Sequence, residues 1–241
     1  MPRFFLSEPP IDHTVTLTGD DAAHIARSLR MAVGETVVLC DGQGTDYTAE
    51  LTDITPQAVT AQILSSAPNT GEPSVRVVLF QGLPKGDKME WIIQKSVELG
   101  VAEIVPFAAA RSISRPDGAS AAKKTARWQK IADEAAGQSQ RGALPCVRPL
   151  ISFSEALRAA AECERVFLCY EGGGAALHTL LQDKPRSVAL FIGPEGGFAP
   201  EEVAAAEQSG AVRITLGPRI LRTETAPLAA LSVVMFATDN M

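Results

Sequence analysis

Short stretches of alternating apolar and polar residues mark the first 70 positions of the chain. The alternating stretches are residues 14–17, 36–40, 47–51 and 59–64. Such alternation indicates strands with one buried face. One helix interrupts them, with Asp20 placed to cap its start and Ile25 and Leu29 on its apolar side. Short strands at this spacing predict a small β-barrel over residues 1–70.

A linker follows at residues 65–74, which are small, polar and interrupted by two prolines. Beyond it, from residue 74 to 241, apolar runs alternate with helix-forming segments. Strands are expected at 75–80, 103–107, 165–169, 187–192 and 211–216. Helices are expected at 87–99, 123–136 and 175–181, after Pro200, and from about 226 to 238, and a mobile basic loop at 109–122. This alternation predicts an α/β domain with a mainly parallel sheet.

Two of the expected helices carry further information. Gly100 follows the helix at 87–99, in the position where a left-handed residue ends many helices. The final helix is apolar on nearly every side over residues 227–237. A helix without a polar face must be covered, so it either enters its own domain or packs against a second subunit.

Three turns rich in glycine follow predicted strands. They are Cys169-Tyr170-Glu171-Gly172-Gly173-Gly174, Gly193-Pro194-Glu195-Gly196-Gly197-Phe198 and the segment 216–226. Glycine lets another group approach the backbone closely, and ligands of α/β sheets bind at the carboxyl ends of the strands. The three turns therefore predict one small-molecule pocket.

Composition indicates where the protein is located in the cell and which kinds of site it lacks. With 46% apolar residues and no apolar run long enough for a membrane span, the chain is expected to be soluble. The N-terminal residues lack the apolar core of a secretory signal, which predicts a cytoplasmic protein. The four cysteines and three histidines show no metal-ligand spacing, so neither a metal nor a disulfide framework is expected.

Charge is distributed unevenly along the chain. The net charge is −6, yet residues 76–148 contain twelve Lys or Arg against seven Asp or Glu, which leaves −11 for the remainder. A basic middle in an acidic chain fits either a phosphate-binding surface or an ordinary solvated helix face.

Four ordered motifs together carry a resemblance that spans the chain. They are Arg3-Phe4-Phe5, the segment from Lys85 to Gly100, Ile192 to Phe198, and Leu216 to Ala226. The chain resembles the ribosomal RNA small subunit methyltransferase E family of the SPOUT superfamily. Ala110, Gly137 and Gln140 depart from the pattern, since members often carry glutamate, glutamate and glycine there.

The resemblance implies both a fold and an activity. It implies a PUA-like RNA-binding β-barrel at 1–70 and a SPOUT α/β domain at 74–241, tied in a trefoil knot that holds S-adenosylmethionine. The implied reaction is methylation of N3 of one uridine in 16S rRNA near the decoding centre, which produces 3-methyluridine. The implied partners are 16S rRNA or the small ribosomal subunit, and a second copy of the chain, bound through the knot domain and the C-terminal helix.

The resemblance and the glycine turns together give the expected site residues. Those expected to bind the cofactor are Leu168, Tyr170, Glu171, Ile192, Gly193, Pro194, Glu195, Gly196, Gly197, Leu216, Gly217, Ile220, Leu221, Arg222, Thr225 and Ala226. Those expected to contact RNA are Arg3, Arg30, Lys85, Lys88, Arg111, Arg115, Gln138 and Arg141.

Three residues are expected to take part in the chemistry. Uridine N3 holds a proton that must leave, and arginine never deprotonates in proteins, so Arg222 is expected to stabilise negative charge on the uracil oxygens. Glu195 or Glu224 is expected to accept the proton. The sequence leaves open which of them does so, and loss of the proton to water is a third possibility.

Two other classes of protein compete with the methyltransferase. One is an RNA-binding module without chemistry, in which the second domain serves only to dimerise. The other is a nucleotide- or phosphosugar-binding enzyme that uses the helix start after Gly197 as an anion site. The chain has no GxxxxGK[ST] motif, and Gly172-Gly173-Gly174 lacks the GxGxxG spacing, which disfavours this second class.

Overall fold

The computed structural model of the chain describes residues 1–6, 8, 10–113 and 118–241. Their contacts divide them into two compact units. Unit 1 contains Met1–Glu72 and Ala136–Leu144, and unit 2 contains Pro73–Ala135 and Pro145–Met241. The first division falls inside the proline-containing linker. Residues 136–144 also belong to unit 1, although they lie far beyond the linker, and the sequence pattern does not predict this.

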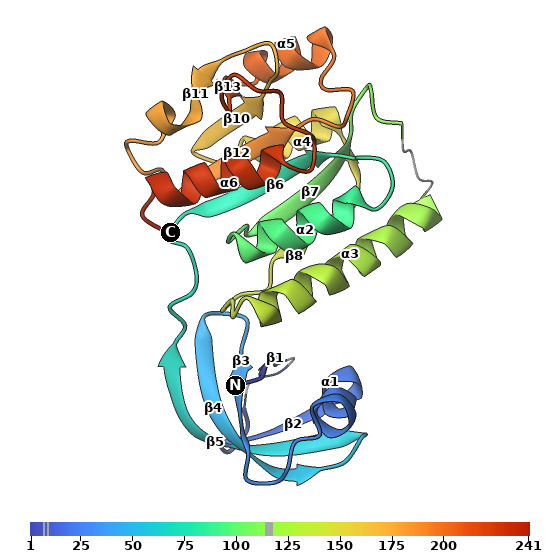
Figure 1. The fold of residues 1–241 in the computed structure, drawn as a ribbon, viewed down its shortest axis with the longest axis vertical. Coiled ribbons are helices and arrows are strands. Elements are labelled where there is room, and N and C mark those ends of the chain that lie inside the picture. The colour runs from blue at the N-terminus through green and yellow to red at the C-terminus, as the bar shows by residue number, and fades with distance from the viewer. Residues whose placement is uncertain (7, 9, 114–117) are drawn as a thin grey trace. The chain divides into compact units, whose positions relative to one another are not determined.

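Unit 1 is built on one curled sheet (Figure 1). Its strands are β1 (Arg3–Phe5), β2 (Thr14–Thr18), β3 (Thr36–Cys40), β4 (Thr45–Ile54) and β5 (Ala58–Pro68). They are ordered β1-β3-β4-β5-β2, and β1 and β2 form the two edges. Two register shifts between β4 and β5, at Thr48/Ala49 and Leu51/Asp53, increase the local bend. The sheet is therefore a curled half-barrel, where the pattern predicts a barrel. Its core includes the fully buried Leu39 and Val59.

The helical segment of unit 1 differs from the expected one. It begins at Gly19 as α1 (Gly19–Ala23) and continues as the π-helix η1 (His24–Leu29). Thr18, rather than Asp20, occupies the N-cap position and makes no side-chain capping bond. Asp20 instead lies in the first turn, where a carboxylate complements the helix dipole. The prediction of a capping role for Asp20 was wrong because the chain turns into the helix two residues earlier.

Two arginines of unit 1 are buried in ion pairs. Arg3 reaches Asp46 through two bonds of 2.7 and 2.5 Å, and its side chain is 7% exposed. Arg141 reaches both carboxylate oxygens of Glu72 at 2.8 Å, and its side chain is 4% exposed. Glu72 also accepts the backbone N–H groups of Gly142 and Ala143. These contacts attach the segment 136–144 to the rest of unit 1.

We expect Glu72→Gln to lower the free energy of unfolding at pH 7 by about 2–3 kcal/mol, because it removes charged hydrogen bonds to a buried arginine. Burial by itself would raise the pKa of Glu72, but its bonds to Arg141 and to two backbone N–H groups lower that pKa further than burial raises it. A depressed carboxyl pKa stabilises the fold above the unfolded pKa, and this stabilisation is lost as the pH falls through the folded pKa. Denaturant unfolding at pH 7 and below about pH 4 should therefore show the difference shrinking with acid.

Asp53→Asn is the matched control for Glu72→Gln, because Asp53 is an exposed carboxylate on β4 of the same unit. It should change stability by less than about 0.5 kcal/mol at either pH. A difference between wild type and Glu72→Gln that stayed constant from pH 7 to pH 4 would contradict the ionic role.

Unit 2 contains a sheet of eight strands between helices. The strands are β6 (Arg76–Gly82), β7 (Glu103–Ala108), β8 (Cys146–Val147), β9 (Ile151–Ser152), β10 (Arg165–Cys169), β11 (Ala175–Ala176), β12 (Ser187–Ile192) and β13 (Val212–Thr215). The main order is β11-β13-β10-β12-β6-β7-β8, and β9 also pairs with β7. Each of these pairings is parallel, which confirms the predicted parallel α/β sheet.

The helices cover both faces of this sheet. They are α2 (Lys88–Glu98), α3 (Gly118–Gln138), α4 (Phe153–Ala160), the 3-10 helix η2 (Leu177–Leu180), α5 (Pro200–Gln208) and α6 (Ala226–Ala237). The last three residues of α3 belong to unit 1. Figure 1 shows α2 and α6 on one face and α4 and α5 on the other. The core on the second side is aromatic: Phe80 stacks on Phe191 with ring centroids 4.5 Å apart, and Phe107 and Phe153 pack beside them.

Three segments of unit 2 differ from expectation. Residues 118–122 are helical rather than part of a loop, since alanine-rich sequence extends α3 toward its start. The segment 175–181 forms β11 and η2 instead of one helix, because its first two residues pair with β13. Helix α4 was not predicted, although Ser152 and Glu155 form a capping box at its start, a signal the sequence does contain.

The final helix α6 ends close to its predicted end and is only partly covered within the chain. Leu231, Val234 and Met235 are buried, and α6 packs on α2 and β12. Phe236, in contrast, is 76% exposed. Gly100 lies beside Met235 with φ +90°, the left-handed conformation expected at the end of α2.

Candidate active site

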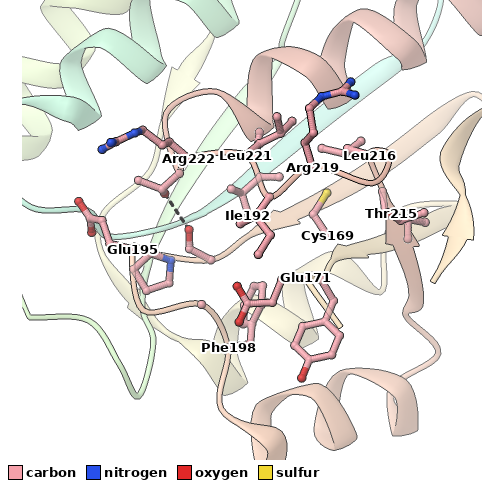
Figure 2. Close-up of a pocket in the computed structure, with 18 of the residues that line it drawn as sticks. Cys169, Glu171, Ile192, Glu195, Phe198, Thr215, Leu216, Arg219, Leu221 and Arg222 are labelled. Carbon is pink, nitrogen blue, oxygen red and sulfur yellow. Dashed lines mark hydrogen bonds between the residues drawn. The ribbon is translucent and has the colours of Figure 1, made fainter. Parts of the chain in front are cut away.

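The three glycine-bearing turns of unit 2 meet at one edge of the sheet. β10 lies between β12 and β13 in parallel register, so the turns that follow these strands leave the sheet on the same side. They surround a pocket of about 340 Å³ (Figure 2). We name the two longer segments the first loop (193–199) and the second loop (216–225).

Backbone conformations at two glycines shape these loops. Gly197 in the first loop has φ +65° and Gly217 in the second has φ +105°, a region that other residues enter only with strain. A side chain at Gly197 would also come within 3.3 Å of the Glu171 carboxylate. The loops can therefore expose their backbone to the pocket without intervening side chains.

Most of the residues predicted to bind the cofactor line this pocket. They are Tyr170, Glu171, Ile192, Gly193, Pro194, Glu195, Gly197, Leu216, Gly217, Ile220, Leu221, Arg222 and Ala226. Leu168 is instead fully buried in the aromatic core, and Gly196 and Thr225 adjoin lining residues without lining the pocket themselves.

Other lining residues were not among those predicted to bind the cofactor. They include Cys169, Phe198, Thr215, Arg219 and Thr223. Each is adjacent in sequence to a predicted turn residue or belongs to the same turn, and this adjacency is the signal that could have found them. Lys88 also lines the pocket, although the sequence predicts it as an RNA contact.

One end of the pocket contains a cluster of three charged residues, the Lys88 cluster (Lys88, Glu195 and Glu224). The Lys88 Nζ lies 3.0 Å from Glu195 Oε1 and 3.2 Å from Glu224 Oε2. Hydrogen bonds to these two carboxylates raise the pKa of Lys88. Burial would raise the pKa of Glu195, but hydrogen bonds from backbone N–H groups and from Lys88 outweigh it and lower that pKa. Lys88 and Glu195 are therefore both charged at neutral pH.

Two arginines of the second loop face different directions. Figure 2 shows Arg222 at the same end of the pocket as Glu195, while Arg219 directs its guanidinium away from Arg222. Neither arginine forms an ion pair with any carboxylate that the structure describes. Arg222 is thus an exposed cation in the pocket lining that a ligand can approach.

The pocket offers no reactive thiol. Burial raises the pKa of Cys169 to about 12, so its thiol is neutral at physiological pH. Across the described residues, no group of three or more His, Cys, Asp or Glu side chains is placed to hold a metal ion. The helices that the structure describes also include none with the length and apolar character of a membrane span.

The residues predicted to contact RNA fall into three groups. Arg30, Lys85, Arg111 and Gln138 are exposed. Arg3, Arg141 and Lys88 are held in the ion pairs described above. Arg115 lies outside the described residues.

Comparison with known families defines the class of protein. Residues 71–235 match the family described as RNA methyltransferase domain, and residues 17–64 match the RNA methyltransferase PUA domain. Because the first of these matches covers more than half of the chain, the protein is an RNA methyltransferase with a PUA domain.

Individual relatives narrow the class further. The ribosomal RNA small subunit methyltransferase E of Bacillus subtilis is 38% identical over 99% of this chain and 98% of its own length. That of Synechocystis is 33% identical over 94% of this chain and 74% of its own. A solved structure of the Neisseria gonorrhoeae protein of this name, bound to S-adenosyl methionine, has a TM-score of 0.88 and 36% identity, and covers 98% and 97% of the two chains. The chain belongs to the ribosomal RNA small subunit methyltransferase E family.

Proposed function

We propose that this protein uses S-adenosylmethionine to methylate N3 of a specific uridine in 16S rRNA near the decoding centre, forming 3-methyluridine. The observation that carries the proposal is the pocket of about 340 Å³, enclosed by the two loops that hold the family motifs. The Neisseria gonorrhoeae relative with bound S-adenosyl methionine supports the same cofactor here.

The residues around the pocket fit this cofactor chemically. S-adenosylmethionine has an adenine edge that requires hydrogen-bond partners, and apolar faces. In the described part of the chain, the backbone N–H groups of Ile220 and Leu221 bond to no other protein group. Ile192 and Leu216 supply apolar walls. Free backbone donors beside apolar side chains are typical of nucleoside-binding pockets.

When bound, S-adenosylmethionine supplies an electrophilic methyl group for in-line displacement. The protein must then align the uracil N3 with that methyl group and exclude competing geometries, which is a positioning task. Arg222 extends from the second loop beside the pocket. Its guanidinium would stabilise the negative charge that the uracil oxygens gain when N3 loses its proton.

Glu195, at the same end of the pocket as Arg222, and Glu224, two positions from it in the chain, are the expected proton acceptors. Both are within ion-pairing distance of Lys88. A carboxylate whose pKa is lowered by a neighbouring ammonium takes a proton less readily than a free one. For Glu195, whose pKa is lowered in this way, the ion pairing therefore favours transfer to water over permanent capture of the proton.

RNA is proposed to reach the enzyme through exposed basic side chains. Arg30 in unit 1, and Lys85 and Arg111 in unit 2, are exposed, and such residues position the phosphate backbone without reading sequence. We assign Arg3 and Arg141 to the stability of unit 1, because binding phosphate would require each to leave a buried ion pair.

The proposal includes a homodimer, a cytoplasmic location and the trefoil knot of the SPOUT superfamily. The exposed apolar side chains of Phe236 on α6 and Ile220 in the second loop support a subunit contact through unit 2. The knot is proposed from the family resemblance, and the two loops that would form it are joined by a hydrogen bond of 2.7 Å from Thr223 Oγ1 to the carbonyl of Gly193.

The deciding experiment is methyl transfer from labelled S-adenosylmethionine to small ribosomal subunits from cells that lack this gene. Nuclease digestion and mass spectrometry should locate one 3-methyluridine in 16S rRNA. Naked 16S rRNA serves as the comparison substrate. If the cofactor binds but no subunit or rRNA is methylated at uridine N3, the proposed substrate is wrong.

A further inference from the structure

Lys88 joins two loops of the pocket that are distant in sequence. It is the first residue of α2, and its ammonium contacts Glu195 of the first loop and Glu224 of the second at 3.0 and 3.2 Å. A cation at a helix N-terminus opposes the helix dipole. Its position there is explained by the two carboxylates it meets rather than by the stability of α2.

The contacts around Lys88 fix the separation of the two loops. The backbone N–H of Lys85 donates to the Glu195 carboxylate at 3.2 and 3.4 Å, which adds a second link from the β6–α2 turn. Beside Glu224, Thr223 Oγ1 donates to the Gly193 carbonyl and accepts from Gln81 Nε2 at 3.1 Å. The first and second loops are thus linked both to each other and to the turn that carries Lys88.

Charge balance makes Lys88 the essential member of this arrangement. Without its ammonium, two carboxylates would face each other at the pocket end and repel. The side chains of Lys88, Glu195 and Glu224 are 32%, 28% and 23% exposed, so solvent screens them less than it screens surface pairs. To bind an RNA phosphate, Lys88 would have to leave two carboxylates at once.

We propose that Lys88 is a positioning residue that holds the first and second loops at the separation required by S-adenosylmethionine, and that it does not contact RNA. The inference rests on the proposed function, since it assumes the same cofactor in the same pocket. Glu195 and Glu224 act with Lys88 as its two anchors, one in each loop. These two carboxylates therefore affect the affinity for the cofactor, which binds before the chemical step.

Calorimetric titration of S-adenosylmethionine into the full-length protein tests the proposal. Lys88→Met should raise the Kd about ten- to a hundredfold, the usual range of coupling between groups that act through one another. Lys88→Arg keeps the charge and should recover most of the affinity. Lys95→Met is the matched control, because Lys95 lies on the same helix, pairs with Glu98 and does not line the pocket. The Kd of the Lys95→Met variant for S-adenosylmethionine should equal that of the wild type.

A double variant separates charge balance from general damage. Lys88→Met combined with Glu224→Gln removes one of the two facing carboxylates, so it should bind the cofactor more tightly than Lys88→Met alone. Damage to the fold would instead make the double variant as weak as Lys88→Met or weaker. Thermal unfolding without cofactor shows whether each variant is folded at the temperature of the titration.

Steady-state methylation distinguishes the remaining roles. The proposal expects a raised KM for S-adenosylmethionine and an unchanged KM for small subunits. An unchanged cofactor Kd with a raised KM for small subunits would make Lys88 an RNA contact and overturn it. The proposal would also be overturned if Glu195→Gln and Glu224→Gln lowered only kcat and left the cofactor Kd unchanged.

The wild type separates this proposal from the proposed function. If the wild type binds the cofactor but methylates no rRNA, the proposed function fails while the titrations still decide the role of Lys88. A wild type that binds no cofactor overturns both the proposed function and the role of Lys88.

Discussion

Replacing Arg222 with alanine is expected to lower kcat for methyl transfer about 100- to 1,000-fold, the usual effect of removing one group that stabilises developing charge. Arg222 forms no ion pair with the carboxylates of the described residues, and it lies at the same end of the pocket as Glu195. Its contribution should appear in the chemical step, because the uracil gains negative charge only as N3 loses its proton. The Kd for S-adenosylmethionine should change much less than kcat.

Two further variants sharpen the test of Arg222. Arg222→Lys keeps the charge but loses the planar, forked geometry, so it should recover only part of the rate. Arg213→Ala removes an exposed arginine of β13 that pairs with Glu207 and does not line the pocket, and it should remain fully active. A variant Arg222→Ala with normal kcat and a much higher cofactor Kd would show that Arg222 only binds the cofactor.

The second large effect is expected from Gly82→Ala at the end of β6. An added Cβ would lie 2.6 Å from Cδ and 2.7 Å from the backbone nitrogen of Pro194, and 3.1 Å from the carbonyl carbon of Gly193. The proline ring and backbone cannot rotate away as a flexible side chain can. The first loop would therefore move, at a cost of about 1–3 kcal/mol in stability. Because this loop lines the pocket, we expect the affinity for S-adenosylmethionine to fall at least about tenfold, equivalent to about 1.4 kcal/mol.

Gly118→Ala is the control for the added methyl group. Gly118 begins α3, and none of the heavy atoms of the described residues outside its chain neighbours lies within 4 Å of the place its Cβ would occupy. This variant should bind the cofactor like the wild type and be as stable or more so, by up to about 1 kcal/mol, since alanine favours helix. Chemical denaturation and calorimetric titration measure both quantities. Normal affinity in Gly82→Ala would show that the first loop can shift without cost to the pocket.

Strands with strong local signals were predicted well. The structure places β10 at Arg165–Cys169 and β12 at Ser187–Ile192, the residues expected from continuous apolar runs that end at turn residues. Strands in the middle of a parallel sheet are buried on both faces, so their own sequence must be apolar throughout. The two-residue strands β8 and β9 lack such a signal, because they exist only through their pairing with β7.

Helix boundaries show where local signals compete. The first helix of unit 1 becomes the π-helix η1 and ends at Arg30 with φ 52°, although the pattern indicates an ordinary amphipathic helix. The widened turn is not encoded by apolar spacing alone. The start of α4 is encoded, since Ser152 and Glu155 are spaced as a capping box.

The candidate site was predictable as a set of loops but not as a set of contacts. Glycine at 193, 197 and 217 locates the pocket because only glycine permits these turns and close approaches. The partners of charged residues cannot be found in the same way. Lys88 was expected to contact RNA, and the sequence did not predict its pairing with carboxylates more than 100 positions away.

By itself, the sequence determined the strand-and-helix alternation, the parallel sheet, the glycine loops and the family, because each rests on local residue preferences or on an ordered motif. The tertiary structure alone decided which charges meet. It paired Arg3 with Asp46 and Arg141 with Glu72, and it placed Lys88 between the two pocket loops. Ion pairs depend on a few ångströms of separation between chain segments, and only the packed sheet and helices set those distances.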